Sequence, residues 1–514
     1  MQGKKDYQEK LFASFQLSER VPKENFYRRL SEVLDLTFLY KRTKAYYGEC
    51  GQKSIDPVVF YKMCLVGYLE NIISDRKLID HCSMRMDILF FLGYDIDEPL
   101  PWHSTVSRTR QLFPESFFEE VFTQVLKMCI DKGMVSGHTQ VIDSAPVKAN
   151  ASMDSLELKV AEDKLEEHIR KTREANESDE PRRKSKGDKS SGDQRTLTAS
   201  ESDLKAIENR NKNWDEKQKR RPGNGVKNAR FTSNKTHYSP TDPDARISVK
   251  PGKARKLNYL SQLSVDTAHH VITDIGADYA DKKDSQCLQD VVHRLKNRLN
   301  KQGVLIHNIL ADTGYSSGDN YAFLEDQGLS AYIPPHGQYK GGPEGFTYNE
   351  EGDYWVCSEQ KHARFRKTFI EHGNKKKQYA TQRKDCRDCP IKSACLGKLL
   401  EKRFDITYYR EEYERTKDRL QTTLGKQLKS KRQSTVEPVF GSLTQYFGMR
   451  KVNTIGIRQA NKVMIMAGTA YNLKKYLKFI AKEAKSKIGG LKQTISNNID
   501  QLLTQIVRLE PLKF

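Results

Sequence analysis

The chain opens with apolar residues at helical spacing. The segment DPVVFYKMCLVGYLENI has a dense apolar face, with Asp56 as a candidate N-cap and Pro57 at the first helical position. Similar patterns follow in RKLIDHCSMRMDILFFLGY and PESFFEEVFTQVLKMCI, and Ser104 or Thr105 is a candidate cap between them. The pattern predicts an all-helical N-terminal domain over residues 1–130.

Short apolar runs typical of strands follow this region. GHTQVIDSAPVK predicts a first core strand within 137–150. Residues 233–339 add a hairpin (YLSQLSVD and VITDIGAD), the amphipathic helix DSQCLQDVVHRLKNRL, and the strands VLIHNILAD and LSAYIPP. Helices over 411–480 complete this core, and IDQLLTQIV predicts a further helix in the tail, 481–514. The order predicts a mixed α/β sheet with helical cover.

Two segments interrupt the core. Residues 151–232 are charged, with a weakly amphipathic helical pattern at 155–175 and a linker-like or disordered stretch at 176–230 that has too little apolar surface to fold alone. The acids of TDPDAR, shortly after, either tune a site or form a turn. The second interruption, 340–410, is polar and rich in cysteine.

The cysteines of this second segment have metal-ligand spacing. Cys386 and Cys389 form a C-x2-C pair, and Cys357 and Cys395 would complete a tetrahedral set of four thiolates. The spacing predicts a closed structural Zn²⁺ site, with two nearby histidines as alternative ligands. A redox pair is the other interpretation, although its usual strand–helix context is absent.

The net charge of the chain indicates a class of binding partner. Lys plus Arg number 88 and Asp plus Glu 67, so the net charge is +21 and the pI about 9.3. Such a chain attracts a polyanion such as double-stranded DNA, although charged faces are also often merely solvated. Arg108 and Arg110, near the start of a predicted helix, are either DNA contacts or surface residues of a helical bundle.

The hydropathy of the chain bears on the cellular compartment in which the protein is expected. No apolar run approaches the roughly 20 residues that a membrane span needs, and the N-terminus, MQGKKDYQEKLF, lacks the apolar stretch of a signal peptide. We therefore expect a cytoplasmic protein without a membrane partner. In that compartment, cysteines are expected as thiols or metal ligands rather than disulfides.

Three acids stand out as candidate chemistry. Asp143 and Asp312 each follow a short apolar run that predicts a strand, and Glu437 lies in a stretch with helical spacing. Carboxylates are hard oxygen ligands of the kind that Mg²⁺ prefers. Alone, each is equally compatible with an ordinary surface acid. Converging in a basic protein, they predict metal-assisted chemistry on nucleic acid.

The sequence motifs around these acids indicate a particular protein family. IDSAPVKANAS, ADTGYSS and VEPVFGSL, in that order, resemble bacterial insertion-sequence transposases of the DDE type. SIDPVVFYKMCLVGYLENIISDRKLID and the following FFLGYDIDEPLPWHSTVSR resemble the helical N-terminal domain of those enzymes. TDPDAR and CRDCPIKSAC resemble one subgroup with a Cys-rich insertion. The resemblance spans nearly the whole chain.

The resemblance implies an RNase H-like core in which Asp143, Asp312 and Glu437 bind two Mg²⁺ or Mn²⁺ ions. In such a site, one ion activates water or a DNA 3′-hydroxyl, and the other stabilises the departing oxygen. No covalent protein intermediate is then required.

The resemblance also implies phosphate contacts near the last acid. Arg432, five residues before Glu437, matches an arginine that related enzymes carry. Thr444 stands where a lysine is expected, and Arg450 and Lys451 are candidate substitutes for it. This departure bears on full activity rather than on the fold.

The implied function is cleavage of DNA at the terminal inverted repeats of an insertion sequence and strand transfer into target DNA. A homodimer on paired ends, associated with the nucleoid, would hold two sites in register. The alternatives are a nuclease without strand transfer and a transposase-derived DNA-binding protein.

Overall fold

The computed structural model describes residues 16–48, 54–167, 170, 197–220, 231–248, 255–337, 339 and 341–508, without side chains for 214–220 and 484–508. The chain divides into two compact units. One comprises 1–132, 147–245 and 442–514, and the other comprises 133–146 and 246–441. Most of the linker-like stretch at 176–230 lies outside the described residues, as does the end of the helix predicted at 155–175.

The N-terminal region is helical, as predicted. Asp56 caps α4 (Pro57–Leu69), because its carboxylate accepts the amides of Val58 and Val59, and Pro57 occupies the first turn. The cap predicted at Ser104 or Thr105 is wrong: α7 begins one residue earlier, after Trp102, without a side-chain cap. The helices are α1 (Leu17–Arg20), α2 (Phe26–Val33), α3 (Phe38–Thr43), η1 (Lys44–Tyr46), α4, α5 (Asp75–Ser83), α6 (Met86–Leu92), α7 (His103–Leu112) and α8 (Glu115–Asp131).

One long helix, α18 (Ile457–Arg508), packs against α8, α4 and α2 of the same unit. No separate tail helix begins at 481, because α18 continues through that position. The TDPDAR acids cap its start. Asp242 accepts the Gly456 amide at 3.1 Å and Asp244 accepts the Ile457 amide at 2.9 Å. Carboxylates at a helix N-terminus satisfy open amides and the helix dipole, so this motif has a structural role.

The charged insertion differs from the helix predicted at 155–175 up to residue 164, whereas residues 165–167 and 170 are helical. Its described start forms short strands and 3-10 turns, because β2 pairs with β5 and β3 pairs with β4. Part of the stretch predicted as a linker is instead the helix α11 (Glu201–Arg220), whose first turn is capped by Ser200. The elements are η2 (Met153–Ser155), β2 (Glu157–Leu158), β3 (Val160–Ala161), η3 (Glu162–Lys164), β4 (Thr198–Ala199), α11 and β5 (His237–Tyr238).

The second unit is built on a six-stranded sheet. Its order is β10-β9-β1-β7-β6, and β8 also pairs with β7. β1 and β9 pair in parallel, β9 and β10 pair in parallel, and β7 and β8 form the predicted antiparallel hairpin. The mixed α/β class is therefore confirmed. The strands are β1 (Thr139–Lys148), β6 (Arg246–Ser248), β7 (Lys256–Asp266), β8 (Ile272–Tyr279), β9 (Asn308–Leu310) and β10 (Ser330–Tyr332).

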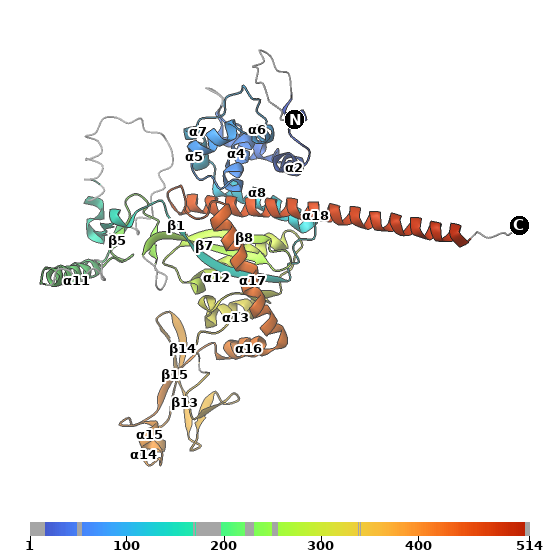
Figure 1. The fold of residues 1–514 in the computed structure, drawn as a ribbon. Coiled ribbons are helices and arrows are strands. Elements are labelled where there is room, and N and C mark those ends of the chain that lie inside the picture. Colours follow the sequence, from blue (N-terminus) through green and yellow to red (C-terminus); the bar gives the residue numbers. More distant parts are fainter. Residues whose placement is uncertain are drawn as a thin grey trace. The chain divides into compact units, whose positions relative to one another are not determined.

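Helices cover this sheet and fix its loops. α12 (Asp284–Asn300) packs on β7 and β8, and α13 (Gly318–Asp326) packs on β10 (Figure 1). Arg294 and Arg298 of α12 both reach the buried carboxylate of Asp274 on β8, at 3.1 Å each. The remaining elements are η4 (Thr313–Tyr315), α16 (Arg410–Gln421) and α17 (Thr423–Tyr446).

Within the cysteine-rich segment, a five-stranded antiparallel sheet forms, in the order β11-β12-β13-β14-β15. Figure 1 labels its last three strands. This segment is polar in composition, and the sequence predicted a zinc site for it. Alternation instead gathers Trp355, Ala363, Tyr379 and Phe404 on one face, where they pack together. The elements are β11 (Phe346–Asn349), β12 (Tyr354–Cys357), β13 (His362–Glu371), β14 (Asn374–Ala380), α14 (Arg383–Arg387), α15 (Lys392–Cys395) and β15 (Arg403–Thr407).

In the part of the chain that the structure describes, no helix combines the length and the apolar character needed to cross a membrane.

Candidate active site

Two predicted acids meet because of strand register. β1 and β9 pair in parallel with Val141 opposite Leu310, and Asp143 and Asp312 each lie two residues further on. In a strand, residues i and i+2 point to the same face. Asp143 therefore lies within β1 at the same level as Asp312, which follows the end of β9. Asp312 also starts η4, where its side chain accepts the Gly314 amide at 2.9 Å.

Asp143 is only partly solvated, with 17% of its side chain exposed. Its Oδ1 accepts the Ser144 amide at 2.8 Å, and its Oδ2 lies 3.3 Å from Nη1 of Arg432 on α17. Burial raises the pKa of Asp143 to about 6, and the neighbouring Asp312 carboxylate adds to the rise, whereas the Ser144 amide and Arg432 oppose it. The site thus concentrates negative charge that a cation would stabilise.

Asp284, the first residue of α12, is a third acid here that the sequence analysis missed. Its Oδ1 accepts the Ser144 hydroxyl at 2.6 Å. A Cβ placed on Gly314 would lie 2.9 Å from Oδ2 of Asp284 and 3.0 Å from Oδ1 of Asp312, so the absence of a side chain there lets both carboxylates approach. No local motif marks Asp284, because only the packing of α12 on the sheet brings it here.

Tyr315 lies beneath the acids. It is fully buried, and its hydroxyl donates to Gln262 Oε1 at 2.7 Å. Burial, together with Asp284, Asp143 and Asp312, raises the pKa of this phenol well above its usual value. A buried, protonated hydroxyl already engaged as a donor is a packing element and a poor nucleophile.

Glu437 lies on α17 with Arg432, but its side chain is exposed. α17 turns Thr435, Val436 and Val439 into the core, which leaves Glu437 at the edge of that buried stripe. In this structure, the side chain of α17 that contacts Asp143 is therefore that of Arg432. Glu437 shares the helix with that contact, but it is not grouped with Asp143 and Asp312.

Among the described residues, no group of three or more His, Cys, Asp or Glu side chains is arranged to hold a metal ion. The donor chemistry of Asp143 and Asp312 still fits Mg²⁺, which takes carboxylate oxygens. Mg²⁺ is often held by only one or two protein carboxylates, with substrate phosphates and water completing its shell.

The predicted zinc ligands do not assemble in this way. Cys386 is buried and lies 3.1 Å from the Thr381 hydroxyl, while Cys357 accepts the Lys361 amide at 3.3 Å. Cys389 and Cys395 are partly exposed free thiols. The aromatic cluster of the small sheet supplies the packing that the zinc ion was expected to provide, so the structure does not support the zinc site.

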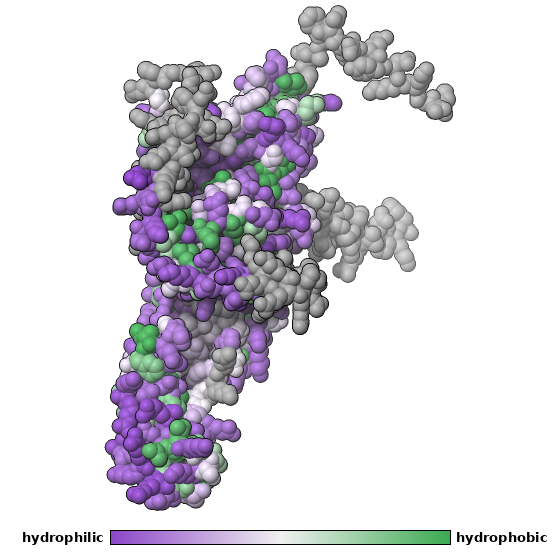
Figure 2. Space-filling model, turned by 90° about the vertical axis from the view of Figure 1, so that its left-hand side faces the viewer, coloured by the Kyte–Doolittle hydropathy of each residue, from purple (hydrophilic) through white to green (hydrophobic). Residues whose placement is uncertain are grey.

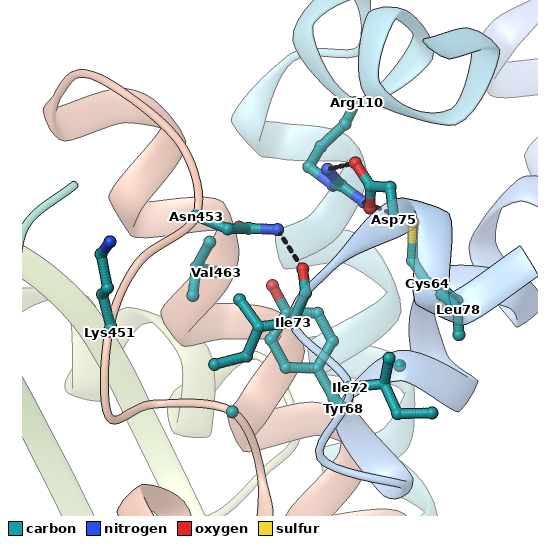
Figure 3. Close-up of a pocket in the computed structure, with 12 residues that line it drawn as sticks. Cys64, Tyr68, Ile72, Ile73, Asp75, Leu78, Arg110, Lys451, Asn453 and Val463 are labelled. Atoms are coloured by element: carbon teal, nitrogen blue, oxygen red, sulfur yellow. Dashed lines mark hydrogen bonds and ion pairs between the residues drawn. The ribbon is translucent and has the colours of Figure 1, made fainter. Parts of the chain in front are cut away.

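The predicted DNA contacts fall into different settings. Arg108, Arg450 and Lys451 are exposed. Arg110 is buried and holds both oxygens of Asp75, at 2.6 and 2.9 Å, on the wall of a pocket (Figure 3). Such a doubly bonded pair is structural, so the prediction that Arg110 contacts DNA is not supported.

The pocket itself is lined from both ends of the sequence. Asn453 donates to the Ile73 carbonyl at 2.7 Å, and Lys451 lies on the opposite side of the pocket from Arg110 (Figure 3). These contacts tie the segment before α18 to the loop after α4. We therefore interpret the pocket as a gap in helix packing.

Two family models match the chain. A transposase domain (DUF772) matches residues 15–112, and a transposase DDE domain matches residues 356–477, which include Glu437. No curated protein matches.

Two solved structures also show likeness. A piggyBac transposase synaptic complex with hairpin DNA is 10% identical, with coverage of 88% of this chain and 73% of that chain, and a TM-score of 0.29. A Mos1 transposase paired-end complex with left transposon end is 11% identical, with coverage of 61% and 73%, and a TM-score of 0.15. TM-scores this low do not establish a shared fold, so we draw no conclusion from these two structures.

Proposed function

Because the chain belongs to the DDE transposases of insertion-sequence type, we propose that it cuts DNA at the ends of its element and transfers the freed strands to a target. The observation that carries this proposal is the pair of aspartates. The parallel register of β1 and β9 supports this pairing, because Asp143 within β1 and Asp312 just after β9 lie at the same level.

We propose that this sheet is an RNase H-like core. The strand path β8-β7-β1-β9-β10, with an antiparallel hairpin on one side of β1 and parallel partners on the other, supports that assignment. The candidate acids then lie on the central strand and just after the end of its parallel neighbour.

We propose that Asp143 and Asp312 hold Mg²⁺ or Mn²⁺, and that Glu437 completes the set when DNA is bound. Divalent ions would polarise the phosphodiester and lower the pKa of an attacking water. Arg432 steadies the Asp143 carboxylate from α17, the same helix that carries Glu437. Substrate phosphates would supply the ligands that these carboxylates leave open.

The attacking group in this account comes from water or from a DNA 3′-hydroxyl, not from the protein. The tyrosines near the acids do not suit covalent attack: Tyr315 is buried, and the Tyr409 hydroxyl donates to Asp319 at 3.1 Å. This arrangement favours direct hydrolysis and transesterification over a tyrosine-linked intermediate.

The test uses duplex DNA carrying the sequences that flank the gene, with a supercoiled target plasmid and Mg²⁺ or Mn²⁺. We expect end cleavage and joined products from the native chain, and neither from Asp312→Asn. Asp319→Asn is the matched control, because Asp319 is an exposed acid close by in sequence, and this variant should stay active.

Each alternative predicts a different product pattern. Cleavage without joined products would identify a nuclease. Binding without cleavage in any divalent metal would identify a DNA-binding derivative of a transposase and contradict the proposal.

A further inference from the structure

The positive charge of the small sheet lies on its last three strands and the segments that join them, because residues 346–360, which include β11 and β12, hold four acids and no lysine or arginine. Residues 361–410 hold 15 lysines and arginines against five aspartates and glutamates, a net charge of +10 in a chain whose total is +21. Figure 2 shows the lower lobe, where this sheet lies, as mostly hydrophilic. A tenth of the chain thus carries about half of its net charge.

β13 and β14 form a two-stranded ribbon at the centre of this charge. They pair antiparallel from Arg364 opposite Ala380 to Glu371 opposite Asn374. His372 and Gly373 make the turn, with φ angles of 49° and 80°, as a two-residue hairpin with matching twist requires. The register shifts once, between Phe365 and Lys367.

The two faces of the ribbon differ. On the inner face, Lys375 lies 3.7 Å from the centroid of the Tyr408 ring, and Lys377 lies 3.3 Å from an Asp353 oxygen, so these cations are engaged within the protein. The opposite face, which we call the outer face, carries Arg364, Lys367, Lys376 and Arg403, together with the acids Glu371 and Asp405. Lys376 pairs with Glu371 at 2.7 Å and Arg403 pairs with Glu401, so a partner would depend on Arg364 and Lys367.

The outer face is open to a partner. Arg364, Lys367 and Arg403 are exposed. Arg364 and Arg403 pair with the same small residue, Ala380, from either side. Two arginines therefore flank a methyl group, and the exposed Arg364 guanidinium has room to reach a phosphate, whereas the Arg403 guanidinium pairs with Glu401.

Protection of a sheet edge explains only part of this charge. Lysines and a bulge on an edge strand discourage pairing with other chains, and Lys367 beside the register shift fits that role. β14, however, is an interior strand paired on both sides, so protection of an edge does not account for Lys376. Cations on three adjacent strands make a surface rather than a guarded edge.

We propose that the outer face of β13–β15 is a docking surface for the phosphate backbone of duplex DNA. This inference rests on the proposed function, which supplies the polyanion. The surface would hold DNA without contributing to the chemistry at the aspartates.

The test measures binding of a fluorescein-labelled duplex carrying the flanking DNA, across a range of salt concentrations. The double variant Arg364→Ala/Lys367→Ala should bind several-fold more weakly and reduce the slope of log affinity against log salt by roughly 1.8, about 0.9 for each lost phosphate contact. The control Lys127→Ala/Lys417→Ala removes two exposed lysines that pair with Asp131 and Glu414, and should keep the native slope.

A fold check accompanies the binding data. Trp355 lies in the aromatic cluster on the inner face, so its fluorescence, read in a chain with Trp102 and Trp214 replaced by Phe, should be unchanged by the double substitution. An unchanged affinity and slope in the double variant, or an equal loss in the control, would overturn the inference. If the native chain neither binds nor cuts duplex DNA, the proposed function itself fails; if it does both and only the slope is insensitive, the docking surface alone fails.

Discussion

Asp143 holds its charge at a cost to folding. Its pKa is raised to about 6, mainly by burial, so between its unfolded value near 3.8 and about pH 6 the folded state binds more protons than the unfolded state. Stability at this position is therefore present below about pH 4 and lost as the pH rises through 6. A site that sacrifices stability for buried negative charge is typical of a functional centre.

Asp143→Asn should therefore stabilise the protein at pH 7 by roughly 1–3 kcal/mol, because the amide carries no charge to desolvate. The gain should vanish below about pH 4, where the native carboxyl is protonated. Chemical denaturation of both proteins at several pH values measures this, with the exposed Asp319→Asn as control. A variant less stable than the native chain at pH 7 would contradict the account.

Arg110 gives a second prediction at this scale. Removing its side chain leaves the Asp75 carboxylate, only 17% exposed, without its partner. Arg110→Ala should lower the free energy of unfolding by about 3–5 kcal/mol. Arg108→Ala, on the exposed side of the same helix, should change it by less than about 0.5 kcal/mol. Urea unfolding measures both free energies. An Arg110→Ala protein of native stability would contradict the structural role and again make Arg110 a candidate DNA contact.

At the scale of single elements, the sequence predicts what local patterns determine. The β7–β8 hairpin, the Asp56 cap and the helix from Asp284 follow from alternation, capping chemistry and period. The strands at 157–161 did not, because two-residue strands exist only through distant partners. For the same reason, the pattern located Asp143 and Asp312 but missed Asp284, whose place depends on the Arg294 and Arg298 contacts of α12.

The small sheet β11–β15 shows the limit of composition. Its polar and cysteine-rich sequence predicted a structural zinc site. The alternation of side chains along its strands instead places its few aromatic residues on one face. We expect the sheet to remain folded in EDTA and to be lost in Tyr379→Ala, a truncation of a fully buried ring that costs about 3–5 kcal/mol.

The measurement is the fluorescence of Trp355 in a chain with Trp102 and Trp214 replaced by Phe. Unfolding of the sheet by EDTA, together with one zinc ion per native chain, would restore the four-cysteine site.

At the scale of the whole molecule, joining two ends to one target needs two active sites held together. A two-fold dimer supplies that geometry, so we expect two chains on a pair of end duplexes. Light scattering with the flanking DNA present measures the mass. One chain per end, under conditions where joined products form, would contradict the prediction.

The central claim is that Asp143 and Asp312 form a divalent-metal centre on DNA. Anomalous diffraction from crystals of the protein with end DNA and Mn²⁺ tests it most directly. The account predicts a Mn²⁺ peak bound by both carboxylates, lost in Asp143→Asn. Crystals with DNA in place and Mn²⁺ bound elsewhere, or not bound at all, would contradict it.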